Sequence, residues 1–175
     1  MTVEGRGNRQ GGEIFLAALA HLSEACDPRT RRAILEDTPL PDDATIIANL
    51  QALSGLAAFN AWLGIEITAA KWGEVEIQLK WRPEFGQYNG YLHASIVGGL
   101  IDTACGFAGT TVTKNLLASQ FSIRCLRPAV AEVFVAKGRV VKPGSRQIFT
   151  SAELYGLGVP DKPFAVGDAI LVPMD

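Results

Sequence analysis

The sequence predicts an α+β domain in which an antiparallel sheet wraps around one long central helix, after an N-terminal helical extension. Three observations support this fold class. Apolar residues recur at helical spacing up to about residue 56, and the pattern then changes to the alternation typical of strands. A long, weakly polar segment, residues 92–113, interrupts the strand-like runs, and its length favours a helix. Three or four further strand-like runs follow, separated by turns that contain Gly or Pro.

Residues 1–55 form the predicted extension, and residues 56–175 form the main domain. A first helix is expected from Ile14 to Leu22, where apolar residues recur at helical spacing, and a second, short helix from Arg29 to Leu35. A third, amphipathic helix is expected where apolar residues recur every three or four positions, at Ile46, Leu50, Leu53 and Leu56.

Two strands are expected before the long helix. The first covers Leu63 to Thr68. In the second, polar residues alternate with the apolar residues Val75, Ile77, Leu79 and Trp81, which is typical of a strand with one buried face. The runs after the helix are Ser119–Leu126, Val133–Val141, Gln147–Tyr155 and Phe164–Leu171.

The central helix divides into an apolar side and a side of small residues. Val97, Leu100, Ala104, Phe107 and Ala108 suit packing against a sheet. The small residues are Ser95, Gly98, Gly99, Gly106 and Gly109, with Asp102 in the middle of their stripe. Each helical glycine costs about 1 kcal/mol relative to Ala, so the stripe suggests that another backbone or a ligand approaches closely. Asp102 then either pairs at an interface or acts as a nucleophile or general base.

Composition argues against several functions. The net charge is −2 and the pI is about 5.7, and the basic residues are scattered, so neither nucleic acid nor an anionic membrane is an expected partner. Three distant cysteines and two histidines offer no metal-ligand spacing. Residues 1–12 lack the features of a signal peptide, and residues 14–22 are too short to span a bilayer. A cytoplasmic protein with reduced thiols is expected.

Three segments carry a family resemblance. Residues 87–95 (QYNGYLHAS), leading into 100–106 (LIDTACG), resemble the hotdog-fold acyl-CoA thioesterases of the phenylacetic-acid-degradation and 4-hydroxybenzoyl-CoA thioesterase type. Residues 121–129 (FSIRCLRPA) look like the third strand and the Arg-Pro-Ala turn of that family. The similarity covers roughly residues 59–172, so residues 56–175 are expected to form a hotdog thioesterase domain.

The resemblance implies catalytic roles for three residues. Asp102 occupies the position of the helix carboxylate that attacks the thioester carbonyl or activates a water. Gln87, with Asn89 as a less favoured substitute, occupies the position of the loop amide that orients the water or the thioester. The Ala94 backbone N–H would polarise the thioester oxygen, aided by the helix N-terminus. Ala94 and Ser95 stand where the family has a Gly-Gly pair, which leaves less room at the helix start.

Further candidates for substrate binding are Gly90, His93, Ser95, Ser119 and Gln120. For His93, a packing or hydrogen-bonding role in the loop is the favoured alternative. The hydroxyl of Ser95 would assist the reaction or merely cap the helix.

Similar enzymes place the site between two subunits, which implies a homodimer, or a homotetramer, with Gln87 and Ala94 from one chain and Asp102 from its neighbour. No metal or bound cofactor is expected, because coenzyme A belongs to the substrate. Two alternatives remain. One is a non-catalytic acyl-CoA-binding or regulatory protein. The other is a hydratase or dehydratase, although the His-Phe-Pro pattern of such dehydratases is absent. The acyl group is left open.

Overall fold

The computed structural model describes residues 41–174. The helices expected at residues 14–22 and 29–35 lie outside this part of the chain. Within it, two helices precede the first strand: α3 (Asp43–Leu56) and α4 (Ala58–Leu63). The remaining elements are β1 (Glu66–Lys71), β2 (Glu74–Lys80), the 3-10 turns η1 (Pro83–Phe85) and η2 (Tyr88–Gly90), α5 (Ala94–Thr110), β3 (Leu116–Cys125), β4 (Val133–Lys142), β5 (Ile148–Gly156) and β6 (Ala165–Pro173).

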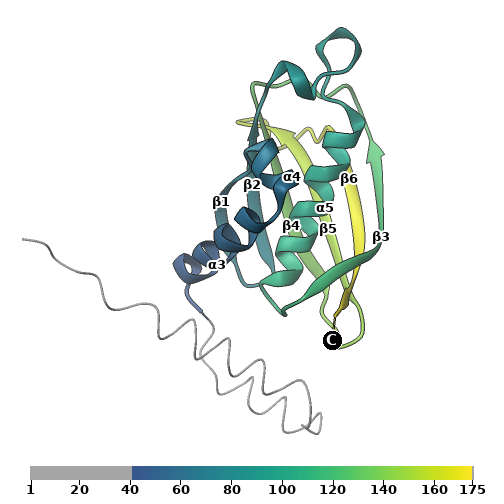
Figure 1. Ribbon diagram of the computed structural model, residues 1–175. Helices are drawn as coiled ribbons and strands as arrows, with labels where there is room; N and C mark the ends of the chain where they lie inside the picture. The colour runs from purple at the N-terminus through teal and green to yellow at the C-terminus, as the bar shows by residue number, and fades with distance from the viewer. Residues whose placement is uncertain (1–40, 175) are drawn as a thin grey trace, which may run out of the picture.

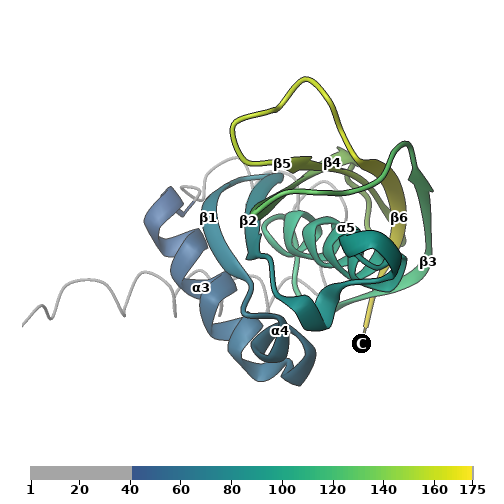
Figure 2. The same ribbon diagram turned by 90° about the horizontal axis from the view of Figure 1, so that it is seen from above.

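The six strands form one antiparallel sheet in the order β1-β2-β4-β5-β6-β3. The sheet curls around α5, so that β3 and β1 lie at its two edges (Figures 1 and 2). Helices α3 and α4 lie beside β1, on the same side of the sheet as α5 (Figure 1). This arrangement confirms the predicted α+β fold, including a helix over residues 46–56.

The core lies between α5 and the concave face of the sheet. Val75, Ile77 and Leu79 are buried, as the alternation in β2 predicts, and they share one cluster with Leu100 and Ile101 of α5, which are also buried. The helix approaches β4 so closely that a Cβ on Gly138 would lie 2.1 Å from the Ala104 carbonyl oxygen. Glycine at this position therefore sets the distance between helix and sheet.

Three predicted boundaries, one of the first strand and two of the central helix, are wrong. The first strand starts at Glu66 rather than Leu63, because α4 continues through Leu63 and ends at Gly64, which adopts a left-handed conformation with φ 72°. The central helix spans Ala94–Thr110 rather than residues 92–113. Leu92 belongs to the preceding loop, where its N–H donates to the Ala129 carbonyl over 3.0 Å.

The α3–α4 unit is fixed at both of its ends. The Asp42 carboxylate caps α3 by accepting from the Thr45 N–H over 2.7 Å. In α4, Phe59 lies against α5 at Gly99, where an added Cβ would come within 2.8 Å of the aromatic ring. No helix among residues 41–174 combines the length and the apolar character needed to cross a bilayer.

Candidate active site

The loop that leads into α5 is held in a tight turn. Asn89 and Gly90 adopt left-handed conformations, with φ 60° and 73°, which both residue types tolerate better than most. The turn lets the Gln87 N–H donate to the Tyr91 carbonyl over 2.8 Å. Asn89 and Gly90 are exposed at the tip of the loop, where their conformations form the turn.

Gln87 lies beside the start of α5. Its side-chain Nε2 donates to the Leu92 carbonyl over 3.2 Å, which orients the amide. Gln87 and Ala94 line one pocket of about 270 Å³, the α5 pocket. The other residues of this pocket are Tyr91, Leu92, Val97, Cys125, Leu126, Arg127, Pro128, Ala129 and Phe164. Two of the three expected catalytic residues therefore meet in one concave site.

The first turn of α5 offers an unpaired backbone donor. His93 caps the helix, and its Nδ1 accepts from the Ser95 N–H over 3.0 Å, with the Ser95 hydroxyl 2.7 Å from the same nitrogen. Both side chains therefore cap the helix start. No acceptor among residues 41–174 takes the N–H of Ala94. A free N–H at a helix N-terminus favours negative charge nearby.

Asp102 lies two turns further along α5, on the face that the sheet does not cover. The carboxylate is half-buried, and burial raises its pKa above the ordinary value, with no compensating donor or cation among residues 41–174. Gly106, one turn on, has open space where a side chain would be. This is the environment of a carboxylate poised as a base rather than one satisfied by a structural ion pair.

The predicted stripe of small residues is only partly correct. Gly98 and Gly109 face the sheet, where an added Cβ would meet Ile123 at 3.6 Å and Leu171 at 2.3 Å. Ser95, Gly99 and Gly106 lie on the open face with Asp102, and Phe59 of α4 covers Gly99. Two glycines thus bring β3 and β6 close to the helix instead of lining a substrate groove.

Within one chain, Asp102 and the α5 pocket are apart. Ala94 and Asp102 are eight positions apart on α5, and at 1.5 Å per residue their backbones lie about 12 Å apart along the helix axis. A reacting carbonyl would have to be within about 3 Å of both the N–H donor and the attacking group. Asp102 is also not among the residues that line the pocket.

The two candidates on β3 are placed elsewhere. The Ser119 hydroxyl donates to the Ile170 carbonyl over 3.1 Å, at a bulge in the pairing of β3 with β6. Beyond the bulge, Gln120 pairs with Ile170 and Phe121 with buried Ala169, so Gln120 points away from α5 and Phe121 towards it. Neither Ser119 nor Gln120 lines the α5 pocket.

One pocket residue that the sequence-based candidates omit is Arg127. Its guanidinium lies 4.4 Å from the centre of the Phe164 ring, and its Nε donates to the Pro163 carbonyl over 3.2 Å. The Arg-Pro-Ala turn, residues 127–129, could have identified Arg127 from the sequence, because this turn places the guanidinium at the pocket.

Other chemistry at this site finds little support. Cys105 is on α5 close to Asp102, but burial raises the pKa of its thiol to about 11, so a thiolate nucleophile is disfavoured at neutral pH. Within residues 41–174, no group of His, Cys, Asp and Glu side chains has the arrangement of a metal site.

Several solved structures resemble this chain. A thioesterase family protein from Silicibacter pomeroyi has 27% identity and a TM-score of 0.68, with 73% of this chain and 96% of that one covered. The E. coli PaaI protein from the phenylacetic acid degradation operon has 21% identity and a TM-score of 0.69, covering 74% and 94%. Zebrafish thioesterase superfamily member 2 has 19% identity and a TM-score of 0.63, covering 73% and 94%.

By sequence alone, no family model and no curated protein matches. The structural likeness covers 73–74% of this chain in these three comparisons. The chain has the hotdog fold of thioesterase-superfamily structures.

Proposed function

We propose that this protein hydrolyses an acyl-CoA thioester to the free acid and coenzyme A, at a site completed by a second copy of the chain. The observation that carries the proposal is the half-buried, unpaired Asp102 carboxylate on the open face of α5. The unpaired Ala94 N–H and the oriented Gln87 amide supply the other functions that acyl transfer needs.

In the proposed reaction, the thioester carbonyl lies in the α5 pocket with its oxygen towards the Ala94 N–H. Asp102 takes a proton from an attacking water, or attacks the carbonyl itself and is released by water afterwards. Negative charge grows on the carbonyl oxygen, where the N–H and the helix N-terminus stabilise it. The C–S bond then breaks, and the sulfur leaves as the thiol of coenzyme A after protonation. Gln87 orients the water or the thioester.

Two features support a second copy. Asp102 lies about 12 Å along the helix axis from Ala94 of the same chain, which is too far to serve the same thioester carbonyl. Within residues 41–174, the edge strand β3 pairs with β6 alone, and its Phe121 remains 51% exposed although it points towards α5. An antiparallel neighbour at β3 would cover this ring and bring the partner's open helix face to the pocket.

The first test is thiol release from a panel of short-chain, aryl and medium-chain acyl-CoAs. Asp102→Asn preserves the shape of the side chain and removes the base, so kcat should fall about 10²-fold or more. Asp161→Asn, which changes an exposed loop carboxylate, is the matched control and should retain activity.

If Asp102→Asn does not change the rate of hydrolysis, the proposed reaction would stand, but the proposed role of Asp102 would be contradicted. Binding of acyl-CoA without turnover by the native protein would favour a non-catalytic acyl-CoA-binding protein instead.

A further inference from the structure

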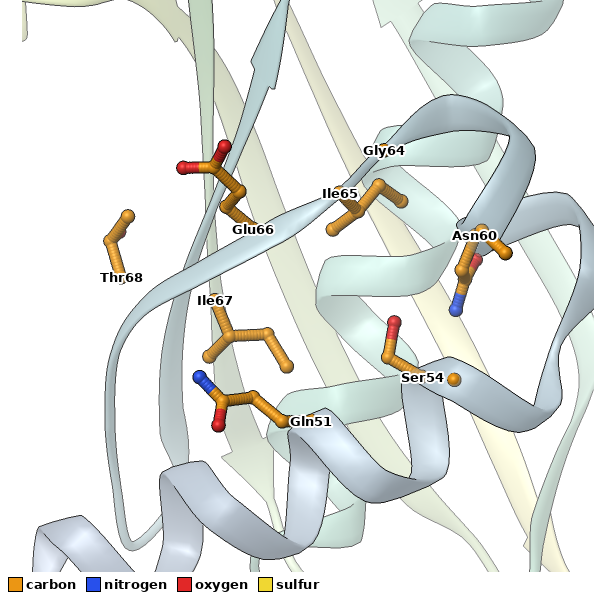
Figure 3. Close-up of a pocket in the computed structure, with 10 residues that line it drawn as sticks. Gln51, Ser54, Asn60, Gly64, Ile65, Glu66, Ile67 and Thr68 are labelled. Carbon is orange, nitrogen blue, oxygen red and sulfur yellow. The ribbon is translucent and has the colours of Figure 1, made fainter.

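A second pocket lies away from the α5 pocket, between α3, α4 and the edge strand β1. It has a volume of about 440 Å³, and none of its lining residues lines the α5 pocket. The polar side chains around it include Gln51, Ser54 and Asn60, and the two isoleucines of its wall are Ile65 and Ile67 (Figure 3). We call it the α3 pocket.

Two polar side chains are buried against this pocket without a partner. Ser54 and Asn60 are each only 8% exposed, and no residue among 41–174 hydrogen-bonds the side chain of either. Within the same residues, no side-chain polar atom is both sealed from solvent and unpaired. The polar ends of Ser54 and Asn60 therefore open onto the pocket, and Figure 3 shows both directed into the space between α3 and α4.

The backbone around Asn60 explains why its side chain is held there. The Asn60 carbonyl accepts from the N–H groups of Gly64 and Ile65, over 2.9 and 3.3 Å, and this closes α4 and turns the chain into β1. The side chain takes no part in these bonds. The amide therefore keeps its hydrogen-bonding capacity for whatever occupies the pocket.

The charge of the pocket limits what can bind. Among residues 41–174, no Lys, Arg or His lines the pocket, and its carboxylate, Glu66, is paired with Lys80 over 2.9 Å. A phosphate or carboxylate would therefore meet no free cation. The side chains of Asn60 and Gln51 each offer a donor and an acceptor in one plane, which matches the edge of another amide. The isoleucines offer apolar contact on one side.

We propose that the α3 pocket is a second binding site, for a small uncharged molecule that carries amide groups. Its hydrogen bonds go to the amides of Asn60 and Gln51 and to the hydroxyl of Ser54. The site is independent of the proposed thioesterase activity, and its test does not depend on turnover.

The test is an NMR titration of the full ¹⁵N-labelled chain with N-acetylglycinamide, which is a neutral diamide. N-acetylglycine, whose carboxylate replaces one amide, is the matched probe. The neutral compound should produce saturable shifts at the side-chain amides of Asn60 and Gln51 and at the backbone of Gly55 and Gly64, with a dissociation constant on the order of 1 mM. The anion should bind at least roughly threefold more weakly, the loss of one hydrogen bond.

Variants then assign the contacts. Asn60→Leu and Ser54→Ala should each weaken binding roughly three- to tenfold, which is the effect of one lost hydrogen bond. Gln147→Leu removes an exposed amide far from the pocket and should leave binding unchanged. If Asn60→Leu does not fold, Ser54→Ala alone tests the assignment.

Shifts that do not saturate, that scatter over the surface, or that persist unchanged in Ser54→Ala would overturn the proposal, and the pocket would then hold water only. If N-acetylglycine binds as tightly as N-acetylglycinamide, the proposal that the pocket selects uncharged amides is overturned.

Discussion

The two edges of the sheet are completed in opposite ways. At one edge, α3 packs on β1, and Leu50 of α3 is 2% exposed in the same core cluster as Ile67 of β1. At the other edge, Phe121 of β3 is half-exposed beside the central helix, and nothing in residues 41–174 covers it. Within residues 41–174, the chain covers one edge with its own helices and leaves the other uncovered, and in our proposal a second copy covers it. The uncovered edge is on the side of the α5 pocket, since Cys125 at the end of β3 lines that pocket.

The largest expected effect comes from placing a charge on the uncovered edge. Phe121→Glu should convert the proposed dimer to a monomer and lower thioester hydrolysis about 10²-fold or more, because in the proposed shared site Asp102 of one chain would no longer reach Gln87 of the other. Gel filtration and thiol release measure the two effects. Leu56→Glu, at an 85% exposed position on α3, is the control and should change neither. A fully active monomer would contradict a shared site.

A large effect on stability is expected at the covered edge. Leu50→Ala removes buried methyl groups between α3 and β1, and should lower the free energy of unfolding by about 2–5 kcal/mol in urea titrations. Leu56→Ala removes the same atoms at an exposed position and should cost less than about 0.5 kcal/mol. Equal losses would mean that α3 does not stabilise this edge.

A smaller effect is expected from the cap of α3. Asp42→Ala removes the acceptor of the Thr45 N–H and should lower the free energy of unfolding by less than Leu50→Ala does in the same urea titrations. The first-turn hydrogen bond and the charge at the helix N-terminus are both lost. Asp42→Asn keeps an acceptor and should recover most of the stability. If Asp42→Ala and Asp42→Asn lower the free energy of unfolding equally, the capping role is ruled out.

The smallest effect concerns the pH dependence at the open helix face. The pKa of Asp102 is raised by burial, so the folded protein binds this proton more tightly than the unfolded chain. The contribution of Asp102 to stability should therefore fall as pH rises from the ordinary pKa of an aspartate through the raised pKa. Asp102→Asn should abolish this dependence and be slightly more stable than the native protein at neutral pH, while its activity is lost. Thermal unfolding from pH 3 to 8 measures the sign, and a less stable variant at neutral pH would contradict it.

Most of the fold could be predicted from the sequence because it depends on local periodicity. The alternation in residues 74–81 predicts the buried face of β2, and all four later strands lie within a few residues of their predicted positions. The boundaries that failed depend on backbone geometry. Leu63 continues the apolar pattern of β1, and only the left-handed conformation of Gly64 separates helix from strand there.

The site was harder to predict, because it combines local and long-range features. The proximity of Gln87 to Ala94 follows from a short loop and was expected from the family resemblance. The bulge in β3 changes which residues face the helix, so Gln120 points outward, and no periodicity predicts a bulge. Arg127 reaches the pocket through the pairing of β3 with β6, which joins segments distant in sequence.

The central claim is that one active site uses Gln87 of one chain and Asp102 of another, and subunit complementation tests it most directly. Gln87→Ala and Asp102→Asn are each purified as nearly inactive dimers, then co-expressed so that the chains mix at random. In a mixed dimer, one of the two sites would contain both native residues. Because half of the dimers are mixed, the mixture should recover about one quarter of the native activity. If the mixture is no more active than the average of the two parent variants, both residues act within one chain and the account is wrong.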